Sequence, residues 1–256
     1  MAFIDIQWRN QPIRIEYEWV GEPHSSNTIL VFLHEGLGSI AMWKYFPEKL
    51  CQQLGLKGLV YSRPAYGQST PRPHDVKWGV DFLHQQAIEV FPEFIKALQI
   101  NQPVHLLGHS DGASIALLVA ALQPHLVNKV AVIAPHIFVE DKTIQSITEA
   151  KVNYEEGSLK KGLSKYHEDV DSAFWGWNDI WLNPDFLRFN ITAELKRISC
   201  PLLAIQGSDD PYGTMAQVKD IVKFVKHARV VEIPNCGHSP HRDSPIILSD
   251  TLKQFV

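Results

Sequence analysis

The sequence predicts an α/β fold, with a mostly parallel, doubly wound sheet and helices on both of its faces. Short continuous apolar runs alternate with longer segments of helical spacing, which is typical of βαβ units. The runs lack the apolar–polar alternation of a half-exposed sheet, as strands buried on both faces do. With 256 residues, 45% of them hydrophobic, the chain can bury one sizeable core.

The elements follow one another in a regular order. The first is a hairpin over residues 4–21, with its turn expected at Asn10-Gln11-Pro12. The helical segment 78–100 should bend near Pro92, because proline removes a helix donor. The other expected elements are strands near 29–33, 58–62, 104–107, 126–134, 201–207 and 228–234, and helices over 39–55, 113–122, 215–228 and 245–256.

One region interrupts this alternation. Residues 137–196 contain no convincing strand. The first part of this segment is rich in charged residues and the last part is rich in aromatic residues. We expect a helical cap or lid there, since an insertion of this length between two core strands is usually functional. The domain division is therefore 1–136 for the first part of the core, 137–196 for the cap and 197–256 for the second part of the core.

Composition excludes several classes of protein. The net charge is −4 and no dense Lys/Arg stripe occurs, so nucleic acid is not an expected partner. Three scattered cysteines suggest free thiols in a reducing compartment. The first residues resemble no secretory signal, and no apolar run approaches the roughly 20 residues of a membrane span. We expect a cytoplasmic protein that acts on a small molecule, and the sequence leaves its oligomeric state open.

A serine stands where a strand meets a helix. Gly108-His109-Ser110-Asp111-Gly112 joins the apolar run at 104–107 to the alanine- and leucine-rich run at 113–122. Gly-x-Ser-x-Gly in that context is the pattern of a nucleophile elbow, a sharp turn that exposes the serine Oγ. Glycines are needed where a Cβ would collide, and the following helix N-terminus favours developing negative charge.

With this motif in that setting, the chain resembles the α/β-hydrolase superfamily over essentially its whole length, and within it carboxylesterase-like serine hydrolases with a helical lid. The resemblance implies a triad in the chain order Ser, Asp or Glu, His. His238, on the loop after the last strand, suits the base that activates Ser110. His227 lies in a helical pattern and His241 further along the loop, so both are weaker candidates.

The acid should come from the loop after the strand 201–207, which offers Asp209 and Asp210. The resemblance favours Asp210, three residues after the glycine that ends the strand. Neighbouring side chains point in different directions, so only one of the two can orient His238.

Backbone N–H groups should stabilise the tetrahedral anion. One is expected from Asp111, the residue after the serine. The other should come from the loop after the strand 29–33, where Gly36 is the first choice and Leu37 the alternative. Glu35 stands where relatives commonly carry glycine. We expect its side chain to face solvent or to serve structure, with tuning of the pocket as the alternative.

Aromatic residues crowd the end of the insertion. Trp177 and Trp181 are four residues apart and share one helical face. They are candidates for substrate binding, although most rows of aromatic residues on one helical face serve packing, here of the lid on the core.

These observations predict a hydrolase that cleaves small, fairly apolar carboxylic esters through an acyl-enzyme on Ser110, without a metal or organic cofactor. Enol-lactone hydrolysis and carbon–carbon bond hydrolysis use the same triad and remain alternatives. A ligand-binding protein on the same fold is the rival from another class.

Overall fold

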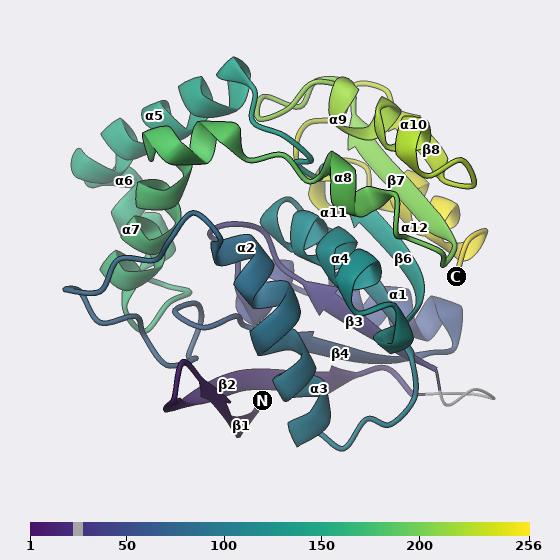
Figure 1. Cartoon of the computed structure of the whole chain (residues 1–256), viewed down its shortest axis with the longest axis horizontal. Coiled ribbons are helices and arrows are strands. Elements are labelled where there is room, and N and C mark those ends of the chain that lie inside the picture. The colour runs from purple at the N-terminus through teal and green to yellow at the C-terminus, as the bar shows by residue number, and fades with distance from the viewer. Residues whose placement is uncertain (23–27) are drawn as a thin grey trace.

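A single eight-stranded sheet organises the chain (Figure 1). The structure is a computed structural model that describes residues 1–22 and 28–256. The strands are β1 (Ala2–Trp8), β2 (Gln11–Val20), β3 (Ile29–Leu33), β4 (Lys57–Tyr61), β5 (Val104–His109), β6 (Val127–Ile133), β7 (Leu202–Gly207) and β8 (Arg229–Ile233). Their order in the sheet is β1-β2-β4-β3-β5-β6-β7-β8. The pairs β1/β2 and β2/β4 are antiparallel and all others are parallel, which confirms the predicted fold class.

Helices cover both faces of the sheet. The core helices are α1 (Phe46–Leu54), α2 (Phe82–Gln85), α3 (Phe91–Ala97), α4 (Asp111–Leu122), α9 (Ala216–Lys219), α10 (Ile221–Phe224), α11 (Pro240–Asp243) and α12 (Pro245–Lys253). One face packs against α3 and α4, and the other against α1 and α12, which gives two separate apolar clusters. The central strands β3 and β5 are buried along their whole length, as their continuous apolar sequences require.

The turn of the first hairpin begins one residue earlier than expected and is one residue shorter. Arg9 and Asn10 form it, both with positive φ, and Trp8 pairs with Gln11. Pro12 is inside β2 instead of in the turn. At that end β2 pairs only with β1, because its pairing with β4 covers residues 17–20, so the missing N–H of proline costs no ladder hydrogen bond there.

Three predicted helices are less regular than their sequences suggested. The segment 39–55 begins as a 3₁₀ turn, η1 (Ile40–Trp43), and breaks at Lys44 before α1. The bend near Pro92 takes the form of a π-helical stretch, η2 (Gln86–Val90), between α2 and α3. Residues 215–228 form two short helices, α9 and α10, instead of one.

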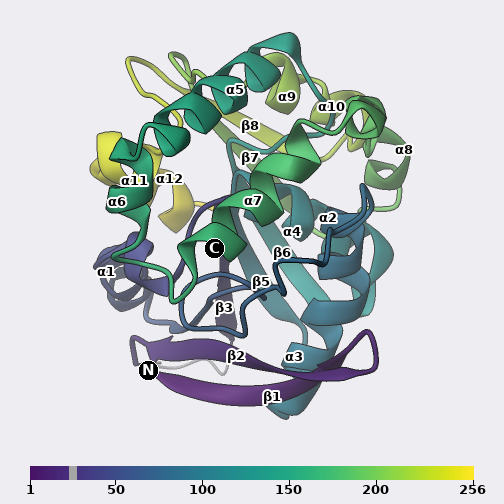
Figure 2. The same ribbon diagram turned by 90° about the vertical axis from the view of Figure 1, so that its left-hand side faces the viewer.

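The segment between β6 and β7 is helical. It contains α5 (Asp141–Glu155), α6 (Ser158–Leu163), α7 (Val170–Trp181), the 3₁₀ turn η4 (Pro184–Arg188) and α8 (Thr192–Leu195). A further 3₁₀ turn, η3 (Pro124–Leu126), lies outside this segment, between α4 and β6. In Figure 2, α5, α6 and α7 form a layer beside the sheet at the end where β5 leads into α4. Along residues 1–22 and 28–256, none of the helices is both long and apolar enough to cross a membrane.

Candidate active site

Ser110 occupies a sharp turn between β5 and α4. Its backbone has φ 53° and ψ −120°, a conformation that costs a non-glycine residue energy. The flanking glycines make the turn possible. A Cβ on Gly108 would lie 2.3 Å from the carbonyl oxygen of Gly112, and a Cβ on Gly112 would lie 2.2 Å from that of Leu33. The strand–turn–helix geometry thus places Ser110 at the carboxyl end of the sheet, where open α/β sheets bind ligands.

Asp111 begins α4 directly after this turn. The first amides of a helix have no intrahelical acceptor, and its dipole favours negative charge nearby. The side chain of Asp111 is buried, and Oδ1 accepts a hydrogen bond of 3.2 Å from the indole of Trp181. Oδ2 is buried without a partner among the described residues. Burial raises the pKa of this carboxyl to about 6, although the buried Arg63 nearby opposes the shift.

His238 follows β8 and meets Asp210, which follows β7. Nδ1 of His238 lies 2.9 Å from each carboxylate oxygen of Asp210. Burial favours the neutral carboxyl, but the hydrogen bond and charge of His238 outweigh it, so the pKa of Asp210 is lowered. The amide of Tyr212 adds a hydrogen bond of 2.8 Å to Oδ1. The structure thus brings together two of the predicted site residues from separate loops.

Asp209 lies in a different environment. Its side chain is exposed and accepts a hydrogen bond of 3.0 Å from Ser208. The other histidines weighed against His238 also lie elsewhere. His227 is exposed and donates to the carbonyl of Cys200, and His241 is buried with its ring 5.0 Å from that of Trp43.

Ser110 and His238 face the same pocket, whose volume is about 290 Å³. Its wall is mainly apolar and is shared by the core and the helical insertion. The remaining lining residues are Glu35, Gly36, Leu37, Met42, Asp111, His136, Ile147, Leu159, Leu163, Trp177, Trp181, Tyr212, Ser239 and Arg242. Within residues 1–22 and 28–256, no direct hydrogen bond joins the hydroxyl of Ser110 to His238.

The loop after β3 forms the wall opposite the serine turn. Gly36 and Leu37 line the pocket, and neither amide has a hydrogen-bond partner in the described part of the chain. A Cβ on Gly36 would lie 2.2 Å from Nε1 of Trp177, so only glycine fits beneath that indole. The carbonyl of Leu37 accepts a hydrogen bond of 2.9 Å from His167. The amides of Gly36 and Leu37, the two candidates for the second N–H donor, are therefore both available to an anion in the pocket.

Buried polar side chains hold this loop in place. The amide of Arg63 donates to Nε2 of His34 at 2.9 Å, which leaves the Nδ1–H of His34 to donate to the carbonyl of Glu35 at 2.7 Å. The guanidinium of Arg63 donates to the same carbonyl at 2.8 Å. Sequence reasoning missed Arg63. Its position just after β4, the neighbour of β3 in the sheet, is the signal that could have identified it.

Of the preferred expectations for Glu35, a side chain that faces solvent is wrong, whereas a structural role fits its contacts. Its side chain is only 19% exposed, and one oxygen lies 3.5 Å from Nδ1 of His109 while the other lies 3.6 Å from Arg242. His109 in turn donates from Nε2 to the main-chain carbonyl of His238 at 2.7 Å. The serine turn is thereby connected to the loop that carries His238, through the side chain of His109.

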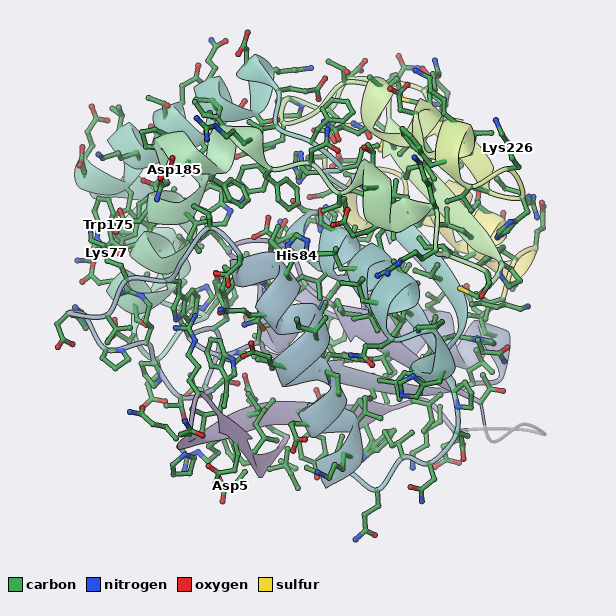
Figure 3. All side chains as sticks on the ribbon, viewed as in Figure 1. Asp5, Lys77, His84, Trp175, Asp185 and Lys226 are labelled. Carbon is green, nitrogen blue, oxygen red and sulfur yellow. The ribbon has the colours of Figure 1, made fainter. Side chains whose placement is uncertain are left out.

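The aromatic residues of the insertion divide between two roles. Trp177 and Trp181 line the pocket, as proposed from their spacing, and Trp181 also packs on Phe186. Phe174 is fully buried and stacks on Tyr154 with ring centroids 3.6 Å apart. Trp175 is partly exposed and lies on the outer side of the layer formed by α5, α6 and α7 (Figure 3).

Comparison with known proteins agrees with this fold. The family model described as "Alpha/beta hydrolase family" matches residues 30–250. The chain is 29% identical over 197 residues to human serine hydrolase BPHL, a match that covers 69% of this chain and 61% of the human protein. It is 24% identical over 278 residues to the sn-1-specific diacylglycerol lipase ABHD11 of Danio rerio, covering 96% of this chain and 83% of that protein.

Solved structures show the same architecture. One, from work on carboxylesterases of the thaumarchaeon Nitrososphaera gargenis, superposes with a TM-score of 0.78 at 17% identity and covers 98% of this chain and 97% of that one. The prediction of a hydrolase is confirmed at the level of the family, since the model matches most of the chain. This chain belongs to the alpha/beta hydrolase family.

Proposed function

We propose that the protein is a serine hydrolase that cleaves small, fairly apolar carboxylic esters through an acyl-enzyme on Ser110. The observation that carries the proposal is the hydrogen-bonded pair of Asp210 and His238 at a pocket that also holds Ser110 on a strained turn. A nucleophile, a base and a group that orients the base are the parts that acyl transfer requires.

The first half of the reaction forms the acyl-enzyme. Oγ of Ser110 bonds to the ester carbonyl carbon while Nε2 of His238 takes the hydroxyl proton. His238 then gives that proton to the leaving alcohol as the carbon–oxygen bond breaks. Asp210 keeps the imidazole in the tautomer with a proton on Nδ1 and stabilises its positive form. Hydrogen bonds between nucleophile and base often tighten only when substrate binds, and the proposal requires this of Ser110 and His238.

Two backbone amides are assigned to the tetrahedral anion. Asp111 supplies the first from the N-terminus of α4, and Gly36 supplies the second from the loop after β3. Both residues line the pocket. Such donors act without reorganising during the reaction, which makes them one of the largest contributions to acyl-transfer catalysis. In the second half-reaction, water bonds to the acyl carbon while His238 takes its proton. His238 then gives that proton to Oγ of Ser110 as the bond between Oγ and the acyl carbon breaks and the carboxylic acid leaves.

The proposed lid comprises residues 137–196. Ile147 of α5, Leu159 and Leu163 of α6, and Trp177 and Trp181 of α7 line the pocket that Ser110 faces. The pocket volume of about 290 Å³ lies at the small end of the range for ligand sites. An apolar wall around a pocket of this size favours short acyl chains.

A substrate panel tests the assignment. We expect turnover of p-nitrophenyl acetate and butyrate, with falling kcat/KM for octanoate and laurate esters. Enol-lactones and dienoic diketones should be poor substrates in comparison. Faster turnover of a lactone or diketone than of every ester would overturn the ester assignment, and no turnover of any of these compounds would favour a ligand-binding protein.

A further inference from the structure

Three side chains that could hold a metal ion lie together beside the pocket, with Glu35 and His238 in its wall and His109 buried next to them. One carboxylate oxygen of Glu35 and one ring nitrogen from each of His109 and His238 all lie within 4.8 Å of one another. They come from three separate places, the loop after β3, the end of β5 and the loop after β8. Two histidines and one glutamate form a ligand set that binds Zn²⁺ in proteins with an open fourth position.

The contact between Glu35 and His109 brings two hydrogen-bond acceptors together when the His109 ring is neutral. Nε2 of His109 must carry a proton, because its partner 2.7 Å away is a carbonyl oxygen. In the neutral ring that has its proton on Nε2, Nδ1 carries a lone pair. That lone pair lies 3.5 Å from a carboxylate oxygen of Glu35. Two acceptors that face each other in a buried site suit a shared cation.

One spacing already matches tetrahedral zinc, the 3.5 Å between the Glu35 oxygen and Nδ1 of His109, whereas the ligand atoms as a group lie within 4.8 Å and must draw together when the ion binds. Zn–N and Zn–O bonds of about 2.0–2.2 Å place neighbouring ligand atoms roughly 3.3–3.6 Å apart. His238 can supply Nε2, because Asp210 occupies Nδ1. A histidine ligand held by a carboxylate through its other nitrogen is the usual arrangement around zinc in proteins.

We propose that Glu35, His109 and His238 form an inhibitory Zn²⁺ site. The bound ion would occupy the Nε2 lone pair of His238. Because that lone pair must accept the proton of Ser110, the protein does not hydrolyse esters while zinc is bound. The binding itself does not depend on the proposed function, whereas the inhibition does. Arg242 lies 3.6 Å from the other oxygen of Glu35 and is half exposed, so its charge opposes a cation there.

Calorimetry on the Ser110→Ala variant tests the binding without any turnover. Titration with zinc chloride at pH 7.5 should show one site per chain. Adding Glu35→Gln, or separately His238→Ala, should weaken the affinity at least about tenfold, and adding Arg242→Gln should strengthen it. The matched control is Glu194→Gln, because Glu194 lies 3.7 Å from His84 of α2, a pair that belongs to no three-ligand group in the described chain. Circular dichroism should show every variant folded.

Two results would overturn the proposal. The first is no zinc binding up to millimolar concentration, or equal affinity in the Glu35→Gln and Glu194→Gln backgrounds. The second concerns the active chain, in which zinc should slow the labelling of Ser110 by a fluorophosphonate and a chelator should restore it. Zinc that binds at Glu35 without slowing that labelling would show that the ion does not occupy His238. An unreactive Ser110 in metal-free protein would instead contradict the proposed hydrolase and leave the calorimetric result intact.

Discussion

Asp210 holds Nδ1 of His238 between its two carboxylate oxygens, each 2.9 Å away, while its neighbour Asp209 is exposed to solvent. The pair is almost completely buried, since the side chains of His238 and Asp210 are 12% and 1% exposed. A carboxylate in this position orients the ring and stabilises its protonated form.

Replacement of these two aspartates should therefore have unequal effects. Asp210→Asn keeps the shape of the side chain but favours the wrong tautomer of His238, so kcat for p-nitrophenyl butyrate should fall about 10⁴-fold. Asp209→Asn is the matched control and should change kcat less than about threefold, because surface substitutions away from a site have small effects. Similar kinetics for the two variants would show that the acid has been assigned wrongly.

Gly36 should tolerate no side chain. A methyl group there would meet the indole of Trp177, which packs 2.2 Å from the position of that Cβ. Gly36→Ala should displace either Trp177 or the loop after β3 and lower kcat/KM about 10–100-fold, since one misplaced anion donor has an effect of this order or larger.

Gly162 in α6 provides the control for Gly36. No atom lies within 4 Å of a Cβ built there. Gly162→Ala should leave kcat/KM unchanged and increase the free energy of unfolding by about 0.5–1 kcal/mol, because alanine loses less backbone entropy in a helix. Equal kinetics for Gly36→Ala and wild type would remove Gly36 from the proposed anion site.

The buried carboxyl of Asp111 should make the free energy of unfolding depend on pH. Burial raises the pKa of this carboxyl from 3.8 to about 6 in the folded chain. The folded state therefore binds the proton more tightly than the unfolded state, so the associated stabilisation is complete below pH 4 and is lost as the pH rises through 6. The difference of about two pKa units corresponds to about 3 kcal/mol.

The Asp111→Asn variant isolates this effect, because asparagine can still accept the hydrogen bond from Trp181 but cannot ionise. Urea unfolding from pH 4 to 7 should show the variant gaining about 3 kcal/mol relative to wild type, with a constant difference above about pH 7. A difference that does not vary with pH would mean that Asp111 is not held in its neutral form by burial.

The sequence predicted those parts of the site that depend on local pattern. The apolar run before Gly108 and the helical run after Gly112 are enough to predict a strand–turn–helix unit, and that unit alone determines where Ser110 lies. His238 was found in the same way, from its place after the last strand.

The sequence did not predict contacts that depend on side-chain direction across loops. Glu35 reaches His109 because β3 and β5 are neighbours in the sheet. It reaches Arg242 because α11 lies close to the loop after β3. Arg63 was not predicted for the same reason, because its hydrogen bonds to His34 and Glu35 depend on β3 and β4 being neighbours in the sheet. The hairpin turn was misplaced because proline suggests a turn, whereas Pro12 is tolerated at the end of β2 that pairs only with β1.

The identity of the nucleophile is the central claim, and labelling with a fluorophosphonate followed by peptide mass spectrometry tests it most directly. We predict one adduct per chain, on Ser110, that disappears in Ser110→Ala and persists in Ser158→Ala, whose serine is exposed on α6. Ser110→Ala should also lose at least about 10³-fold in kcat. An adduct on another residue, or full ester turnover by Ser110→Ala, would contradict the account.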